Sequence, residues 1–203
     1  HALVAYHTKE ADPVHKVTII PRGRALGVTA QLPVNEKHNY SKKYLLGRLD
    51  ILMGGRCAEK LIFNDTTTGA GNDIAVATDL SRKMVTEWGM ADKIGPLAFA
   101  QKPEEIFSGR DISQGNDLSD EMCNLIDSEI TKLVKKAEEN ADDILGNNID
   151  QLHAIAKALL EFESIDGNDL SRLVNGEKIV KIQPDKQLEE KPHRRRSKKD
   201  KAS

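Results

Sequence analysis

Apolar residues recur at helical spacing through most of the chain and predict a mainly α fold. The stretches with this spacing cover residues 1–8, 41–62, 73–88, 119–145, 152–162 and 168–174. Ser41 and Ser119 stand directly before two of them, where a hydroxyl can accept hydrogen bonds from the free amides of a first helical turn. Gly54 and Gly55 fall inside the second stretch. Each costs roughly 1 kcal/mol relative to Ala in a helix, so the pair indicates close packing at that point.

Two further stretches alternate between apolar and polar residues and are rich in β-branched side chains. They are Val14–Ile20 and Ala25–Leu32, with Pro21-Arg22-Gly23 between them as a turn signal. The chain is therefore expected to fold as an array of about six helices with a small two-stranded β-ribbon. Residues 90–117 carry prolines and scattered glycines, and we expect a long irregular connection there.

A glycine-rich segment runs straight into the third helical stretch, in the sequence TTTGAGNDIAVATDL from Thr66 onward. Asn72 is the expected N-cap of this helix. Asp73 then falls in the first turn, where the positive end of the helix dipole favours an ionised carboxylate. A fixed carboxylate after a glycine loop can serve as a metal ligand, and it is equally typical of an ordinary capped helix.

The chain begins HALVAYHT, a helical and apolar run with no capping residue ahead of it. The other histidines show no metal-ligand spacing: His7, His15, His38, His153 and His193. An uncapped helix that opens on a histidine is what a His-Glu-x-x-His zinc motif leaves when it is cut before its second histidine. His1 is therefore a candidate metal ligand, and His15 is expected to be an ordinary core or surface residue.

Long ordered motifs give the chain a resemblance to a known family. After HALVAYH come DPVHKVTIIPRGRALGVTAQLP (Asp12–Pro33), MGGRCAEKLIF (Met53–Phe63), TTGAGNDIAVATDLSRKMVTEWGM (Thr67–Met90) and KIGPLAF (Lys93–Phe99). Together they resemble the FtsH-type ATP-dependent zinc metalloproteases from His1 to about Val174. The resemblance implies that His1 matches the second zinc histidine and that Asp73 matches the third zinc ligand.

The same resemblance assigns the other candidate site residues. Glu59, in the shared Gly-Gly-Arg-x-Ala-Glu segment, is expected either to orient a ligand histidine or to be a plain surface carboxylate. Leu26, Gly27, Val28 and Thr29 lie on the second strand, whose edge would hold an extended peptide by backbone pairing. The family's first zinc histidine and its catalytic Glu would lie upstream of this chain. The 203-residue chain is therefore expected to be inactive alone.

For the whole protein, the resemblance implies a membrane-anchored homo-hexamer that degrades unfolded or misfolded membrane and cytoplasmic proteins. Its ATP would be used by an upstream ATPase domain, and its zinc-containing peptidase domain would face the cytoplasm at a bacterial inner membrane. The chain has no apolar run near 20 residues, so the membrane anchors are expected upstream. The alternative function is a non-catalytic module that holds the hexamer together.

Composition and charge then separate a body from a tail. Residues 177–203 hold ten Lys and Arg against five Asp and Glu, whereas the remaining residues hold twenty against twenty-seven. We expect residues 1–175 to form the metallopeptidase domain and 176–203 a charged, disordered tail. The tail could be solvated or could contact anionic lipid. Nucleic-acid binding is disfavoured because the body is acidic and lacks an aromatic platform. Cys57 and Cys123 form no disulfide framework and are expected to be small core residues.

Overall fold

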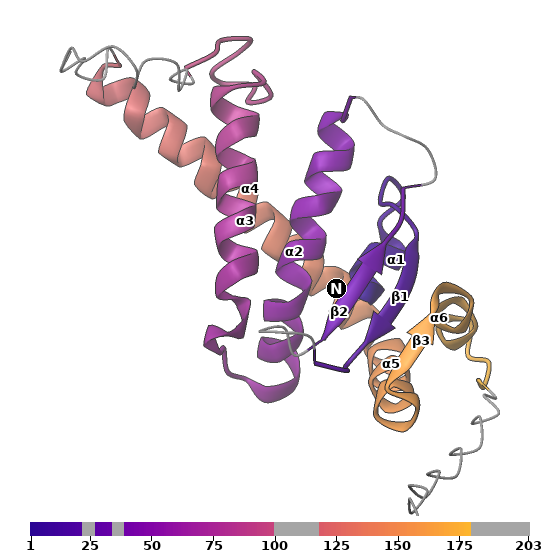
Figure 1. The fold of residues 1–203 in the computed structure, drawn as a ribbon. Coiled ribbons are helices and arrows are strands. Elements are labelled where there is room, and N and C mark those ends of the chain that lie inside the picture. Colours follow the sequence, from indigo (N-terminus) through magenta and orange to yellow (C-terminus); the bar gives the residue numbers. More distant parts are fainter. Residues whose placement is uncertain (22–26, 34–38, 100–117, 180–203) are drawn as a thin grey trace, which may run out of the picture.

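The computed structural model describes residues 1–21, 27–33, 39–99 and 118–179 (Figure 1). Within these ranges the elements are α1 (Ala2–His7), β1 (Val14–Thr18), β2 (Val28–Gln31), α2 (Lys42–Phe63), the 3₁₀ helix η1 (Thr68–Ala70), α3 (Gly71–Thr86), α4 (Asp120–Asn147), α5 (Ile149–Phe162), β3 (Ser164–Asp166) and α6 (Gly167–Val174). The predicted mainly α fold with six helices is confirmed for this part of the chain.

Helices α2, α3 and α4 pack against one another and form the larger part of the molecule (Figure 1). Helix α4 has 28 residues, which makes it about 42 Å long. Its C-terminal half contributes Ala137, Ala141 and Leu145 to the main core. Its N-terminal half contributes Ile126 and Ile130 to a second apolar cluster, together with residues at the end of α3 and in the segment after it. One long helix therefore joins two cores.

The helix starts that the sequence predicted at two serines are confirmed. Ser41 Oγ accepts a hydrogen bond from Tyr44 N at 3.2 Å, and Ser119 Oγ accepts one from Met122 N at 3.2 Å. Helix α2 runs unbroken through Gly54 and Gly55. The glycine pair therefore leaves the hydrogen-bonded helix intact and changes only what can approach its surface.

The small sheet has three antiparallel strands in the order β2-β1-β3: the predicted ribbon of two strands is present as β1 and β2, and the prediction missed the third strand, β3. Val17 in the central strand pairs with Thr29 on one side and Ile165 on the other. Strand β3 follows α5 directly, after Glu163 turns the chain with a left-handed φ of 58°. Because β3 has only three residues, no alternating pattern could reveal it. In the described part of the chain, β2 and β3 are the two edges of the sheet.

Helix α1 is buried where it contacts α2, α4 and β1. Leu3 and Val4 are 2% and 0% exposed. An apolar helix in this position fixes the start of the chain against α2, as Figure 1 shows by the position of the N-terminal label. The side chain of His1 is placed by this burial rather than by the local sequence around it.

The structure describes residues beyond the predicted domain boundary at residue 175. Helix α6 begins with a capping box in which Asp166 and Asp169 each accept a hydrogen bond from the other's backbone amide. The described residues continue to Ile179, which is partly buried against the main core. Residues 180–203 of the predicted tail, and residues 100–117 of the predicted connection, lie outside the described residues. In the helices that the structure describes, none combines the length and apolar content needed to cross a bilayer.

Candidate metal centre

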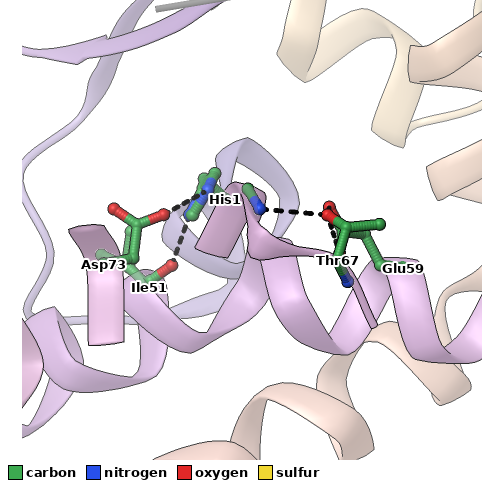
Figure 2. A network of polar contacts seen from close by, with 6 residues as sticks. His1, Ile51, Glu59, Thr67 and Asp73 are labelled. Carbon is green, nitrogen blue, oxygen red and sulfur yellow. Dashed lines mark hydrogen bonds and ion pairs between the residues drawn. The ribbon is translucent and has the colours of Figure 1, made fainter. Parts of the chain in front are cut away.

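The imidazole of His1 is held over α2 by a hydrogen bond from one of its two ring nitrogens. His1 Nδ1 lies 2.7 Å from the backbone oxygen of Ile51 (Figure 2). A carbonyl oxygen can only accept, so Nδ1 carries the hydrogen and donates it. In the neutral ring this leaves a lone pair on Nε2. A backbone contact of this kind is the usual way in which a protein fixes the tautomer of a metal-binding histidine.

The other nitrogen of His1 faces the carboxylate of Asp73. Nε2 lies 3.4 Å from Asp73 Oδ2, and the two side chains are 34% and 29% exposed. Both atoms are acceptors when the ring is neutral, so their approach becomes favourable when a cation or a second proton lies between them. The separation is longer than an ordinary N–H···O hydrogen bond of about 2.7–3.2 Å. It equals the distance of about 3.4 Å between nitrogen and oxygen ligands on a tetrahedral zinc ion with bonds near 2.0–2.2 Å.

The sequence correctly placed Asp73 in the first turn of its helix but wrongly chose the cap. Helix α3 begins at Gly71, its N-cap is Ala70, and no side-chain hydrogen bond caps it. The 3₁₀ turn η1 comes first and is capped by Thr67, whose Oγ1 accepts from Gly69 N at 3.1 Å. Asn72 therefore already lies inside the helix. The dipole argument for an ionised carboxylate at Asp73 is unaffected.

Glu59 holds the loop that leads to Asp73. Its carboxylate accepts hydrogen bonds from the backbone N of Thr67 at 3.1 Å and from Thr67 Oγ1 at 3.1 Å (Figure 2). These bonds tie α2 to the start of η1, and α3 with Asp73 follows. The sequence left two alternatives for Glu59, a carboxylate that orients a ligand histidine and a plain surface carboxylate. In the structure its hydrogen bonds to Thr67 hold the segment that leads to Asp73.

The donor set fits a zinc ion, with two of the protein ligands that such an ion takes. An imidazole nitrogen and a carboxylate oxygen are ordinary zinc ligands. Within the described ranges, no group of three or more His, Cys, Asp and Glu side chains could hold a metal. His7 binds Gln151 through Nε2 at 2.8 Å, and His15 is exposed, so neither belongs to the site. His38 and His193 lie outside the described residues.

The predicted peptide-binding residues lie at a sheet edge. Val28 and Thr29 belong to β2, and Gly27 precedes it directly. Leu26 lies outside the described residues. Val28 is 40% exposed, so the edge strand presents an apolar side chain to solvent. The geometry is suitable for pairing with an extended chain.

Comparison with known proteins agrees with the geometry. Residues 1–173 match the family described as Peptidase family M41. The chain belongs to this family. Its resemblance to the FtsH-type metalloproteases is thereby confirmed, and the family is one of metallopeptidases.

Curated relatives carry the same assignment. Two are named "ATP-dependent zinc metalloprotease FtsH": one from Acidobacterium capsulatum, 50% identical over 91% of this chain, and one from Magnetococcus marinus, 50% identical over 87%. A third, "ATP-dependent zinc metalloprotease FtsH 1" from Thermoanaerobacter sp., is 46% identical over 90% of the chain. The chain spans 29%, 26% and 30% of the lengths of these relatives.

Proposed function

We propose that this chain is the peptidase portion of an ATP-dependent zinc metalloendopeptidase. The proposal is based on the position of His1. Its Nδ1 is hydrogen-bonded to a backbone carbonyl, while Nε2 faces Asp73 Oδ2 at 3.4 Å. His1 and Asp73 would hold the zinc ion. A zinc ion bound there would lower the pKa of its water to about 7 and polarise the carbonyl of the peptide bond.

The remaining residues of the site position these two ligands. The carbonyl of Ile51 keeps the hydrogen of His1 on Nδ1, which leaves the lone pair of Nε2 free for the metal. Glu59 and Thr67 hold the turn before α3, which would keep the backbone of Asp73 in position before an ion binds. Such preorganisation reduces what metal binding costs in side-chain ordering.

The substrate would be an extended polypeptide bound along the outer edge of β2, at Gly27, Val28 and Thr29, with Leu26 next to them in the sequence. Backbone pairing recognises any extended chain and is nearly independent of its sequence. A folded protein offers few free extended segments. The proposed substrates are therefore unfolded or misfolded polypeptides, including membrane and cytoplasmic proteins.

The setting of the whole protein is part of the same proposal. The relatives' name includes ATP dependence, which fits an ATPase domain that unfolds substrates and delivers them to this domain. We infer a homo-hexamer anchored in the bacterial inner membrane, with the peptidase domain on the cytoplasmic side. Residues 176–203, with their surplus of basic residues, could then contact anionic lipid.

A chain extended by four residues tests the proposed activity. Placing His-Glu-Ala-Ala directly before His1 would put the added histidine one helical turn away on the same face, with Glu in position to act as general base. The extended chain should cleave unfolded casein in the presence of zinc, and a chelator should stop the cleavage. Casein needs no unfolding, so the assay does not depend on the ATPase.

Matched variants separate catalysis from folding. The 203-residue chain without the extension should show no cleavage, because general base catalysis alone contributes about 10²–10⁴-fold. In the extended chain, Asp73→Asn should abolish cleavage while leaving the melting temperature nearly unchanged, since Asp73 does not cap α3. Full cleavage by the Asp73→Asn variant, with zinc retained, would refute the assignment. A folded, zinc-loaded extended chain without activity would favour the non-catalytic assembly module instead.

A further inference from the structure

The two adjacent glycines of α2 lie beneath the start of the chain, but each faces a different part of it. A glycine inside a helix costs roughly 1 kcal/mol relative to Ala, so each position needs a reason. A Cβ built on Gly54 would lie 2.9 Å from Val4 Cγ2 and 3.3 Å from His1 N. Val4 is fully buried. Gly54 therefore allows helix α1 to pack closely on α2.

Gly55 faces the imidazole of His1 rather than the body of α1. A Cβ at this position would lie 2.6 Å from His1 Nε2 and 2.9 Å from His1 Cε1. Ile51, whose carbonyl accepts the hydrogen of Nδ1, lies one helical turn earlier. The ring therefore lies against the turn of α2 between Ile51 and Gly55. It is hydrogen-bonded to the carbonyl of Ile51, and because residue 55 is glycine no side chain there obstructs it.

We propose that Gly55 is a positioning residue for the metal site, a role that rests on the proposed function. The absence of a side chain at residue 55 lets His1 Nε2 point at Asp73 while Nδ1 keeps its bond to Ile51. The size of residue 55 then sets the metal affinity of the site without any contact between that residue and the metal.

The consequence of adding one methyl group follows from the distances. Ordinary contact begins at 3.4 Å, so a Cβ at residue 55 requires Nε2 to move by about 0.8 Å. The obstructing atoms belong to a side chain, so the ring can swing away and the fold can survive. A displaced ring loses either its bond to Ile51 or its distance to Asp73. Metal ligands need to be held within about 0.5 Å of their working positions, so the affinity must fall.

Three glycine-to-alanine variants of the 203-residue chain separate the roles. Gly55→Ala is the test, Gly54→Ala changes the packing of α1, and Gly146→Ala is the control, because a Cβ at Gly146 would meet nothing within 4 Å. Zinc affinity is measured by competition with a chromophoric chelator. Asp73→Asn identifies the fraction of zinc binding that belongs to the site, since chelation by the amino group and ring of His1 alone would not depend on Asp73.

Gly55→Ala should weaken the Asp73-dependent zinc binding by about 10–100-fold, the range found for residues that orient metal ligands. Its thermal stability should stay near that of the parent chain, whereas Gly54→Ala should be clearly destabilised. Gly146→Ala should keep parent zinc affinity. In the zinc-free protein, long-range ¹H–¹⁵N spectra of His1 should show the Nδ1–H tautomer in the parent. Loss of this tautomer in Gly55→Ala would show that the ring gives up its bond to Ile51, and its retention that the ring gives up its distance to Asp73.

The outcomes distinguish this inference from the proposed function. If Asp73→Asn abolishes site binding but Gly55→Ala binds zinc within twofold of the parent, the role of Gly55 is refuted and the zinc site stands. A Gly55→Ala variant as unstable as Gly54→Ala would also refute it, because residue 55 would then be a packing position. If zinc binding by the parent does not depend on Asp73, the proposed function fails and the inference fails with it.

Discussion

Replacing Glu59 with Ala tests whether the loop before α3 must be held for Asp73 to bind a metal. The carboxylate accepts from the amide and the hydroxyl of Thr67, both at 3.1 Å. Hydrogen bonds to a charged group contribute about 1.5–3 kcal/mol when shielded. These are open to solvent, so we expect a combined loss of about 1 kcal/mol.

The loss should appear in two measurements. For a domain of this size, about 1 kcal/mol lowers the melting temperature by about 2–4 °C in calorimetry. Zinc binding must then order the loop before α3 at a cost of the same size, about 1 kcal/mol. This cost corresponds to about a fivefold weaker zinc affinity. Thr67→Val removes the hydroxyl but keeps the amide, so a double-mutant cycle with Glu59→Ala should show a coupling energy.

Glu139→Ala is the matched control. Glu139 is an exposed carboxylate paired with Lys136 within α4, and removing an exposed pair of this kind changes stability little. If Glu59→Ala and Glu139→Ala change the melting temperature and the zinc affinity equally, the hydrogen bonds between Glu59 and Thr67 do not hold the loop before α3 in place. Additive effects of Glu59→Ala and Thr67→Val would likewise show that the two side chains do not act together.

Two further predictions concern the core and the end of the chain. Burial, with the carboxylates of Asp142 and Glu138 nearby, raises the pKa of the Cys57 thiol to about 12, so at pH 8–9 it stays protonated and unreactive. A thiol reagent should label only Cys123 in the native chain, and fast labelling of both cysteines would contradict this. Deleting residues 180–203 should change the unfolding free energy by no more than about 0.5 kcal/mol. Deleting from residue 176 should cost more, because the contact of Ile179 with the core is lost; equal melting temperatures for the two deletions would show that this contact is unimportant.

The sequence correctly predicted features of the structure that depend on residues close together in the chain. Ser41 and Ser119 cap their helices through residues three positions away, so the sequence alone located these starts. It failed at Asn72 because a 3₁₀ turn begins the segment earlier than the apolar pattern does. It also extended the third helical stretch too far: the stretch was predicted to reach residue 88, whereas α3 ends at Thr86 and Trp88 is 43% exposed.

The site itself depends on contacts that no local pattern contains. His1 and Asp73 are far apart in the sequence, and only the resemblance to a family suggested that they meet. The burial of α1 brings them together, since its packing on α2 requires Gly54. The glycine pair was recognised as a point of close packing, but the sequence could not show that Gly55 faces an imidazole ring.

The position of bound zinc shows whether His1 and Asp73 are metal ligands. Crystals of the chain grown with zinc, measured on both sides of the zinc absorption edge, would give an anomalous difference map of the ion. We predict one strong peak between His1 Nε2 and Asp73 Oδ2, about 2.0–2.2 Å from each atom. A peak that contacts His1 but not Asp73, or zinc bound only elsewhere on the chain, would contradict the assignment of this site.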